Sequence, residues 1–162
     1  MSTAIDTSPL PSRHALRTLI EGLVGRDVEL KDCDPVSAKT TNVIAVYVND
    51  KLAVSALVVV DLEGAARLGG ALAMLPRGGV DDAIAERDLP SMIRDNTYEV
   101  LNVLAAVFNV ENAPHVRLYE MYGPSGSVPS DVLALSQALG SRLDIQLSVA
   151  GYGAGKLSVI TR

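Results

Sequence analysis

The sequence predicts a single α+β domain in which a mainly antiparallel sheet is covered on one face by long helices. The β-branched runs at residues 41–48 and 52–60 are separated by Asn49-Asp50, a turn signal that favours a hairpin. A second hairpin is expected at the end of the chain, from residues 143–150 and 156–161. Because hairpins connect most of the strands, the sheet should be antiparallel, and the amphipathic helices between them should pack on it.

The beginning of the chain predicts a tail followed by a helix. Residues 1–11 are polar and lack the basic and apolar segments of a signal peptide. Ser12 is suited to cap a helix through Val24, and Gly25 is expected to end it. We therefore expect a flexible tail at 1–11 and one domain at 12–162.

The centre of the chain predicts two helices separated by a loop. Asp61 can cap a helix that continues through Leu75 and stops before Pro76. Its Gly69-Gly70 pair lowers helix propensity but permits another backbone to pack closely. Residues 76–79 are expected to form a loop. The remaining expected elements are a strand at residues 27–31, a long helix at 91–109, a strand at 115–122 and a short helix at 129–139.

Composition limits the classes of function. The formal charge of −5, without a basic stripe, argues against a nucleic-acid-binding protein. The single Cys33 excludes an internal disulfide and a multi-cysteine metal site, and it agrees with a reducing compartment. The longest apolar runs are shorter than the roughly 20 residues that cross a bilayer. We therefore expect a cytoplasmic protein that binds neither nucleic acid nor membrane.

The signatures of common enzyme classes are absent. The segment from Gly151 to Lys156 is rich in glycine, but it lacks the first Gly and the final Ser or Thr of a phosphate-binding loop. A flexible hairpin tip is the expected structure there. His14 and His115 lie on different elements without neighbouring ligand residues, so no metal site is predicted.

The long helix carries a polar stripe with the pattern Asp95-x-x-x-Glu99-x-x-Asn102. At 3.6 residues per turn, these side chains project within about a third of the helix circumference. Ala106 lies at the middle of the stripe, and Ser91 and Asn109 extend it. The opposite side is expected to face the core with Ile93, Val100, Leu101, Leu104, Val107 and Phe108. An acid and an amide one turn apart could hold a partner's cation and a water, and a solvated helix face is the simpler alternative.

The stripe and the segment before it resemble the CheC/CheX/FliY family of response-regulator phosphatases and flagellar switch proteins. The segment runs Leu68-Gly-Gly-Ala-Leu-Ala-Met-Leu-Pro76, and an acidic linker joins it to the stripe. In that family, a helix rich in Ala, Gly, Leu and Met and ending in Met-Pro or Leu-Pro precedes an Asp/Ser-x-x-x-Glu-x-x-Asn helix. The first helix here has no Glu-x-x-Asn, so the single-site arrangement is similar to CheX. Family members often have Asn where this chain has Val107.

The resemblance implies a CheC/CheX-like fold and a role for each residue of the stripe. Asn102 would orient the water that attacks the aspartyl phosphate of a phosphorylated receiver domain, and Glu99 would pair with the active-site lysine of that receiver. Asp95 and Ala106 would belong to the partner-binding surface. The protein would have no cofactor of its own, since Mg²⁺ would be bound by the receiver. A homodimer that joins exposed sheet edges is also expected.

A second interpretation uses the same fold without catalysis. In a flagellar-switch type of assembly, the domain would be a binding module and the stripe would be ordinary surface. Partner binding would then survive the simultaneous loss of Glu99 and Asn102. An unrelated α+β domain is the third interpretation.

Overall fold

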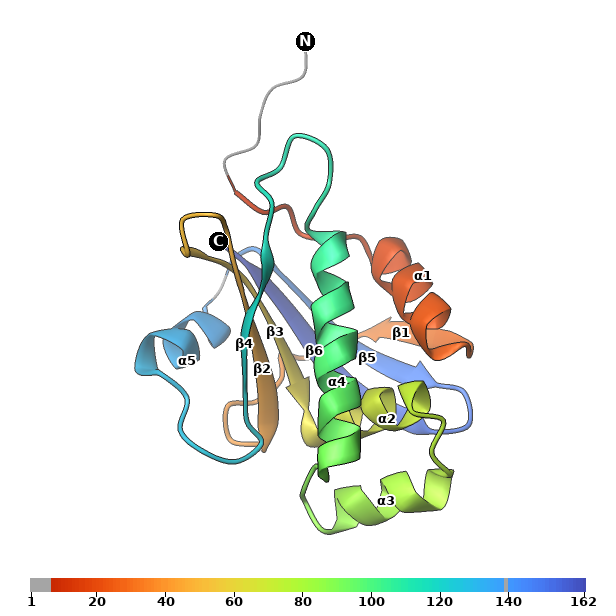
Figure 1. The fold of residues 1–162 in the computed structure, drawn as a ribbon. Coiled ribbons are helices and arrows are strands. Elements are labelled where there is room, and N and C mark those ends of the chain that lie inside the picture. Colours follow the sequence, from red (N-terminus) through yellow and green to blue (C-terminus); the bar gives the residue numbers. More distant parts are fainter. Residues whose placement is uncertain (1–6, 139) are drawn as a thin grey trace.

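The computed structural model describes residues 7–138 and 140–162, which form a six-stranded sheet with flanking helices (Figure 1). Every neighbouring pair of strands is antiparallel, in the order β1-β5-β6-β3-β2-β4. The predicted α+β class is confirmed. The strands are β1 (Val28–Asp32), β2 (Asn42–Val48), β3 (Val54–Asp61), β4 (Arg117–Tyr122), β5 (Arg142–Val149) and β6 (Gly153–Thr161). The helices are α1 (Arg13–Val24), α2 (Leu62–Leu72), α3 (Arg77–Ala85), α4 (Ser91–Leu104), the 3₁₀ turn η1 (Ala105–Val107) and α5 (Ser130–Ser136).

The strand order repeats one arrangement on the two sides of the sheet centre. Outward from the central pair, β6-β5-β1 on one side matches β3-β2-β4 on the other. Along the chain, α1-β1-β2-β3 corresponds to α4-β4-β5-β6, and each group places its first strand at the edge of the other group. The fold is therefore pseudo-symmetric in topology, although the sequence shows no repeat at the level of residues.

The main core lies between the sheet and the long helices α1, α2 and α4, which cover one face as predicted (Figure 1). Alternate residues of β2, namely Val43, Ala45 and Tyr47, point into this core and are fully buried. Along α4, η1 and the residue after them, the whole expected core side is buried, which confirms the assignment of Ile93, Val100, Leu101, Leu104, Val107 and Phe108.

A second, smaller core lies on the opposite face, and the sequence did not predict it. The other alternate residues of β2, Ile44, Val46 and Val48, pack there with Val132 of α5. β2 and β3 are therefore buried on both faces, which explains why their sequences are continuous apolar runs instead of alternating ones. α5 is short, and only a few of its side chains contribute to this core.

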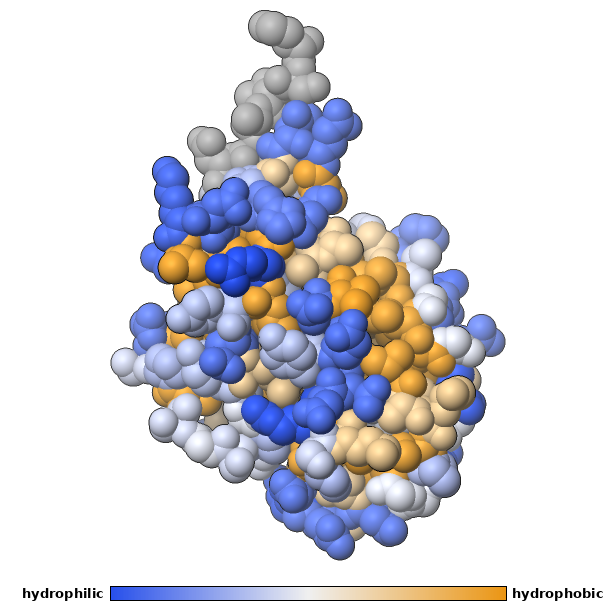
Figure 2. Space-filling model, in the orientation of Figure 1, coloured by the Kyte–Doolittle hydropathy of each residue, from blue (hydrophilic) through white to orange (hydrophobic). Residues whose placement is uncertain are grey.

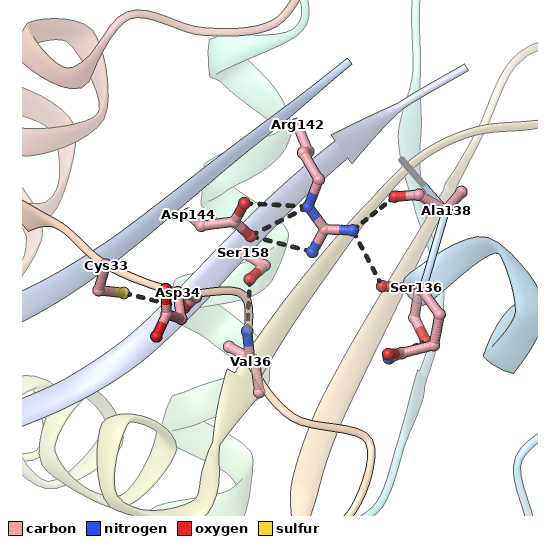
Figure 3. Close-up of polar contacts among 9 residues, drawn as sticks. Cys33, Asp34, Val36, Ser136, Ala138, Arg142, Asp144 and Ser158 are labelled. Atoms are coloured by element: carbon pink, nitrogen blue, oxygen red, sulfur yellow. Dashed lines mark hydrogen bonds and ion pairs between the residues drawn. The ribbon is translucent and has the colours of Figure 1, made fainter. Parts of the chain in front are cut away.

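Polar contacts fasten α5 and the segment after β1 to this second face (Figure 3). The Arg142 guanidinium pairs with Asp144 at 2.9 Å and donates to the Ala138 carbonyl at 2.6 Å, so it joins the end of α5 to β5. The Val36 N–H donates to the Ser158 hydroxyl at 3.1 Å. The Arg142–Asp144 pair is mostly buried, and both carboxylate oxygens accept hydrogen bonds. Removing one partner would leave the other charge buried without its counter-ion, which destabilises more than breaking a surface ion pair does.

Two predicted helix ends are confirmed, and two are corrected. The Ser12 hydroxyl caps α1 by accepting from the Ala15 N–H, and Gly25 ends it with φ 67°. α2 ends at Leu72 instead of residue 75, and α4 ends at Leu104 instead of residue 109. The short helix at 129–139 is observed as α5, but Leu139 lies outside the described residues, as do residues 1–6 of the predicted tail.

The predicted loop at residues 76–79 is wrong, because α3 begins at Arg77. Proline is accepted at a helix start, where its missing N–H has no helical partner. Val80 of α3 packs directly over Gly70 of α2, where an added Cβ would lie 2.3 Å from a Val80 methyl group. This tertiary contact outweighs the poor helix propensity of Gly78 and Gly79.

The predicted hairpin between β5 and β6 is confirmed, and hydrogen bonds anchor its tip. The Tyr152 hydroxyl donates to the Leu75 carbonyl at 2.6 Å. Arg67 donates to the Tyr152 carbonyl at 3.0 Å, and Arg26 donates to the Ala150 carbonyl at 3.2 Å. The glycine-rich segment that was expected to be flexible is therefore tied to α2 and to the end of α1.

Candidate functional site

α4 presents the predicted polar stripe to solvent. Asp95, Glu99 and Asn102 are all exposed, and Ala106 is exposed in η1 directly beyond them. Figure 2 shows hydrophilic residues along the middle of this face, with hydrophobic surface beside them toward α1. The structure thus brings the four predicted site residues together on one side of α4 and the 3₁₀ turn that follows it.

The polar groups of the stripe are free to meet a partner. Among the described residues, the α4 side chains that make hydrogen bonds are Arg94, Asn96 and Thr97. None of the ion pairs in the described chain involves Asp95 or Glu99. The stripe therefore offers two uncompensated carboxylates and a neutral amide, which suits a partner that brings a cation.

Close packing against α2 holds the middle of α4. The Thr97 hydroxyl is buried and donates to the Ala65 carbonyl of α2 at 2.8 Å. At Gly69, an added Cβ would lie 2.3 Å from the Thr97 hydroxyl and 2.5 Å from the Ile93 carbonyl. Only glycine allows the two helices to approach this closely, which confirms the packing predicted from the Gly69-Gly70 pair.

A buried tyrosine holds the end of α4 that carries Asn102. The Tyr47 hydroxyl, on β2, donates to the Leu101 carbonyl at 2.5 Å. Beyond this point the helix tightens, because the Ala105 N–H bonds to the Asn102 carbonyl and η1 follows. Sequence reasoning missed Tyr47, since a tyrosine within an apolar strand gives no sign of its partner 54 positions away.

Asn109 does not extend the stripe, contrary to the prediction. It lies past the end of the helix, where its side-chain amide donates to the Val116 carbonyl at 2.9 Å and accepts from the Val116 N–H at 2.8 Å. This pair of bonds fixes the loop that leads into β4. Asn109 therefore has a structural role.

An apolar groove adjoins the stripe at Ala106. It has a volume of about 360 Å³ and lies between α1 and the segment formed by η1 and the residues after it. Its lining residues are His14, Ala15, Thr18, Leu19, Ala106, Val107 and Val110. Val107, at the position where family members often have Asn, is buried and so does not contribute to the exposed stripe.

α1 does not provide a second stripe of this kind. Its Glu21 carboxylate accepts a hydrogen bond from the Val28 N–H at 2.9 Å, and Val24, three residues later, is buried. Glu21 is the residue of α1 that would correspond to Glu99, and its carboxylate is already hydrogen-bonded to the backbone at the start of β1.

The other reactive residue types do not form a site within the described part of the chain. No three His, Cys, Asp or Glu side chains come together there to hold a metal ion. Cys33 follows β1, and burial raises the pKa of its thiol, which opposes formation of the thiolate. His14 is exposed on α1, and His115 is exposed in the loop before β4. No described helix has the length and apolar character needed to span a membrane.

Comparison with known proteins identifies the fold. No family model and no curated protein matches the chain. Among solved structures, CheX of Borrelia burgdorferi, in its complex with CheY, BeF₃ and Mg²⁺, covers 91% of this chain over 93% of its own at 14% identity and a TM-score of 0.56. The chain has the CheX fold.

The FliM middle domain shares this CheX-like fold. The domain from H. pylori matches 91% of this chain over 83% of its own, at 9% identity and a TM-score of 0.54. FliM in the FliG–FliM complex from H. pylori matches 91% over 85%, also at 9% identity, with a TM-score of 0.53. The fold implied by the resemblance is confirmed, and at these identities the likeness concerns the fold alone.

Proposed function

We propose that this protein is a CheX-like phosphatase that hydrolyses the aspartyl phosphate of a response-regulator receiver domain. The observation that carries the proposal is the exposed pair Glu99 and Asn102 on α4, whose side chains make no hydrogen bond or ion pair within the described chain. The fold is shared with a CheX whose crystal structure contains CheY, BeF₃ and Mg²⁺. A cytoplasmic location follows from the proposed partner.

Asn102 is assigned the task of orienting the attacking water. Phosphoryl transfer depends mainly on positioning and on stabilisation of charge, so little covalent chemistry is required of the protein. A carboxamide both donates to and accepts from a water, and it adds no negative charge to a site that already holds a phosphoryl group. The Mg²⁺ belongs to the receiver in this proposal.

Glu99 is assigned to docking, through an ion pair with the receiver's active-site lysine. Asp95 lies about one turn before it and adds negative charge to the same surface. Ala106 has a small side chain, so it leaves room for the partner next to Asn102. Both residues are therefore proposed as partner-binding positions.

The test is a phosphate-release assay on receiver domains of the same cell, phosphorylated by a small-molecule phosphodonor. We expect Asn102→Ala to lower kcat about 10²-fold, as removal of a positioning hydrogen-bond group does in other enzymes. Glu99→Ala should raise KM about tenfold with a smaller effect on kcat, because a docking charge is lost.

Asn96→Ala is the matched control, since Asn96 lies on the same helix about 120° around its axis from Asn102 and donates only to the Met92 carbonyl. It should keep the wild-type rate. Equal rates of receiver dephosphorylation with wild type, with Asn102→Ala and with no protein would remove the catalytic assignment.

A non-catalytic binding module is the alternative function. It is favoured by the apolar groove beside Ala106, which offers contact area without catalytic groups, and by the fold shared with FliM in its complex with FliG. Titration calorimetry with the receiver separates the two functions. In the binding module, affinity stays unchanged in the double variant Glu99→Ala/Asn102→Ala, and no phosphate is released.

The homodimer joined through sheet edges also remains a proposal. β1 and β4 are the two edges of the sheet, and each leaves one row of backbone groups without a strand partner in the described chain. Light scattering coupled to size exclusion measures the mass in solution. A mass of 17.0 kDa at all concentrations would exclude the dimer.

A further inference from the structure

The end of α4 contains a change of helix type directly after Asn102. In a regular α-helix the Ala105 N–H would bond to the Leu101 carbonyl, four residues earlier. Here it bonds to the Asn102 carbonyl, three residues earlier, and Phe108 and Asn109 continue the three-residue pattern. The change leaves the Leu101 carbonyl without its helical donor. Short 3₁₀ segments are frequent at the C-termini of α-helices, and here the segment directly follows the turn that carries Asn102.

The Tyr47 hydroxyl supplies the missing donor. Tyr47 and Leu101 are fully buried, so water cannot replace this bond at the Leu101 carbonyl. Burial strongly raises the pKa of the Tyr47 phenol, which keeps the hydroxyl protonated as a donor. The tyrosine ring also contacts Phe108, with 5.3 Å between centroids, so it touches the chain on both sides of η1.

We infer that Tyr47 is a positioning residue for Asn102, because its hydroxyl holds the Leu101 carbonyl and thereby sets the pitch of the turn from Asn102 to Ala106. The inference rests on the proposed function for its catalytic meaning, while the positioning itself is a property of the free protein. Loss of the hydroxyl frees the Leu101 carbonyl to recover the Ala105 N–H, and the turn that presents Asn102 then changes its geometry.

The first experiment measures positioning without any partner. Tyr47→Phe removes only the hydroxyl and keeps the ring against Phe108. Nuclear magnetic resonance on ¹⁵N-labelled protein should show shifts of the Asn102 side-chain amide and faster hydrogen exchange of backbone amides within residues 102–109, with the rest of the spectrum unchanged. An Asn102 side-chain amide unchanged in Tyr47→Phe would overturn the inference, whatever the activity.

Tyr152→Phe is the matched control. Its hydroxyl also donates to a backbone carbonyl, that of Leu75 at 2.6 Å, but this bond lies just beyond the end of α2 and not at the stripe. This variant loses the same type of bond and should leave the Asn102 amide unchanged. A similar shift of the Asn102 amide in both variants would show a general loosening and would contradict a specific role for Tyr47.

The second experiment measures catalysis on a phosphorylated receiver. Tyr47→Phe should lower kcat about tenfold, as a small misplacement of a catalytic group does, and should leave KM within about twofold. In the Asn102→Ala background it should cause no further loss, since the group that it positions is gone. An equal additional loss in that background would overturn the inference. If the wild-type protein is inactive on every receiver, the proposed phosphatase function is wrong. The resonance experiment on the free protein still tests whether Tyr47 positions Asn102.

Discussion

At the end of β3, the Asp61 side chain accepts hydrogen bonds from the backbone N–H groups of Gly64 at 2.8 Å and Lys156 at 3.0 Å. It caps α2, as the sequence predicted, and it also joins that helix to β6, which the sequence did not show. Burial raises the pKa of this carboxyl from its ordinary value of 3.8, and the two N–H bonds oppose the shift only in part. The ionised form is therefore less favourable in the folded protein than in the unfolded chain.

This shift has a definite sign for stability. Because the folded-state pKa is raised, the contribution of Asp61 is complete below the unfolded pKa and is lost as the pH rises through the folded pKa. We expect Asp61→Asn, which keeps an acceptor oxygen without the charge, to gain free energy of unfolding relative to wild type as the pH rises from 3 toward 7. Urea unfolding at several pH values measures the difference between the two proteins.

Asp61→Ala is the comparison that removes the acceptor itself. It should lose about 1–3 kcal/mol at pH 7, since both N–H groups lose their partner. A constant difference between Asp61→Asn and wild type across the pH range would show that the carboxyl titrates normally in the fold.

At the scale of elements, the pairing of α2 with α4 fixes the orientation of the stripe. Gly69 permits the contact, and Thr97 adds a buried hydrogen bond across it. The apolar side of α4 then faces the sheet, so the polar side must face solvent. The exposure of Glu99 and Asn102 thus follows from packing on the opposite side of their own helix.

Gly69→Ala should separate these two helices. The added Cβ would overlap Thr97 and the Ile93 carbonyl, and overpacking of this kind costs about 1–3 kcal/mol. Gly22→Ala, on the exposed side of α1 with no atom within 4 Å of the new Cβ, should instead stabilise by about 0.5–1 kcal/mol. Chemical denaturation measures both, and a gain of similar size in the two variants would indicate that helix propensity, not the contact, decides the effect.

The elements also show what sequence patterns reveal. The hairpins, the caps at Ser12 and Asp61, and the two-sided pattern of α4 are local signals, and all were predictable. α3 was missed because its stability comes from the contact between Val80 and Gly70, which no local pattern contains. The stripe could be found from helical spacing, but the bond from Tyr47 to Leu101 depends on how a distant strand lies beneath the helix.

For the whole molecule, the central pair β3 and β6 is the best-protected part of the sheet. Each has a strand on both sides, and most of their residues are buried. β1 lies at an edge, and Glu29, Lys31 and Asp32 on it are not buried. The edge strand β4 carries a register shift between its pairs with Val46 and Tyr47 of β2, and Tyr119 beside that shift is 54% exposed. The charges on β1 and the irregular register of β4 disfavour nonspecific pairing with other chains, so the proposed dimer requires two complementary edges.

Native-state hydrogen exchange should reproduce this ranking. We expect the slowest amides in β3 and β6, with exchange governed by global unfolding, and the fastest amides of the sheet in β1. The measurement needs only the isolated protein at neutral pH. Slower exchange in β1 than in β6 would contradict the ranking, and it would also indicate that a second molecule covers the β1 edge.

The central position of β6 also determines when the sheet can be completed during synthesis. β6 fills the middle of the sheet and is the last of the six strands to be synthesised, so before it appears the native strand pairs that can form belong to two separate groups, β1 with β5 and β3 with β2 and β4. The apolar edge of β3 is open during that interval, and open strand edges of nascent chains are where wrong association begins. The sheet is therefore completed by the insertion of a central strand between two groups made earlier, and chaperone binding at the β3 edge would be most valuable just before that step.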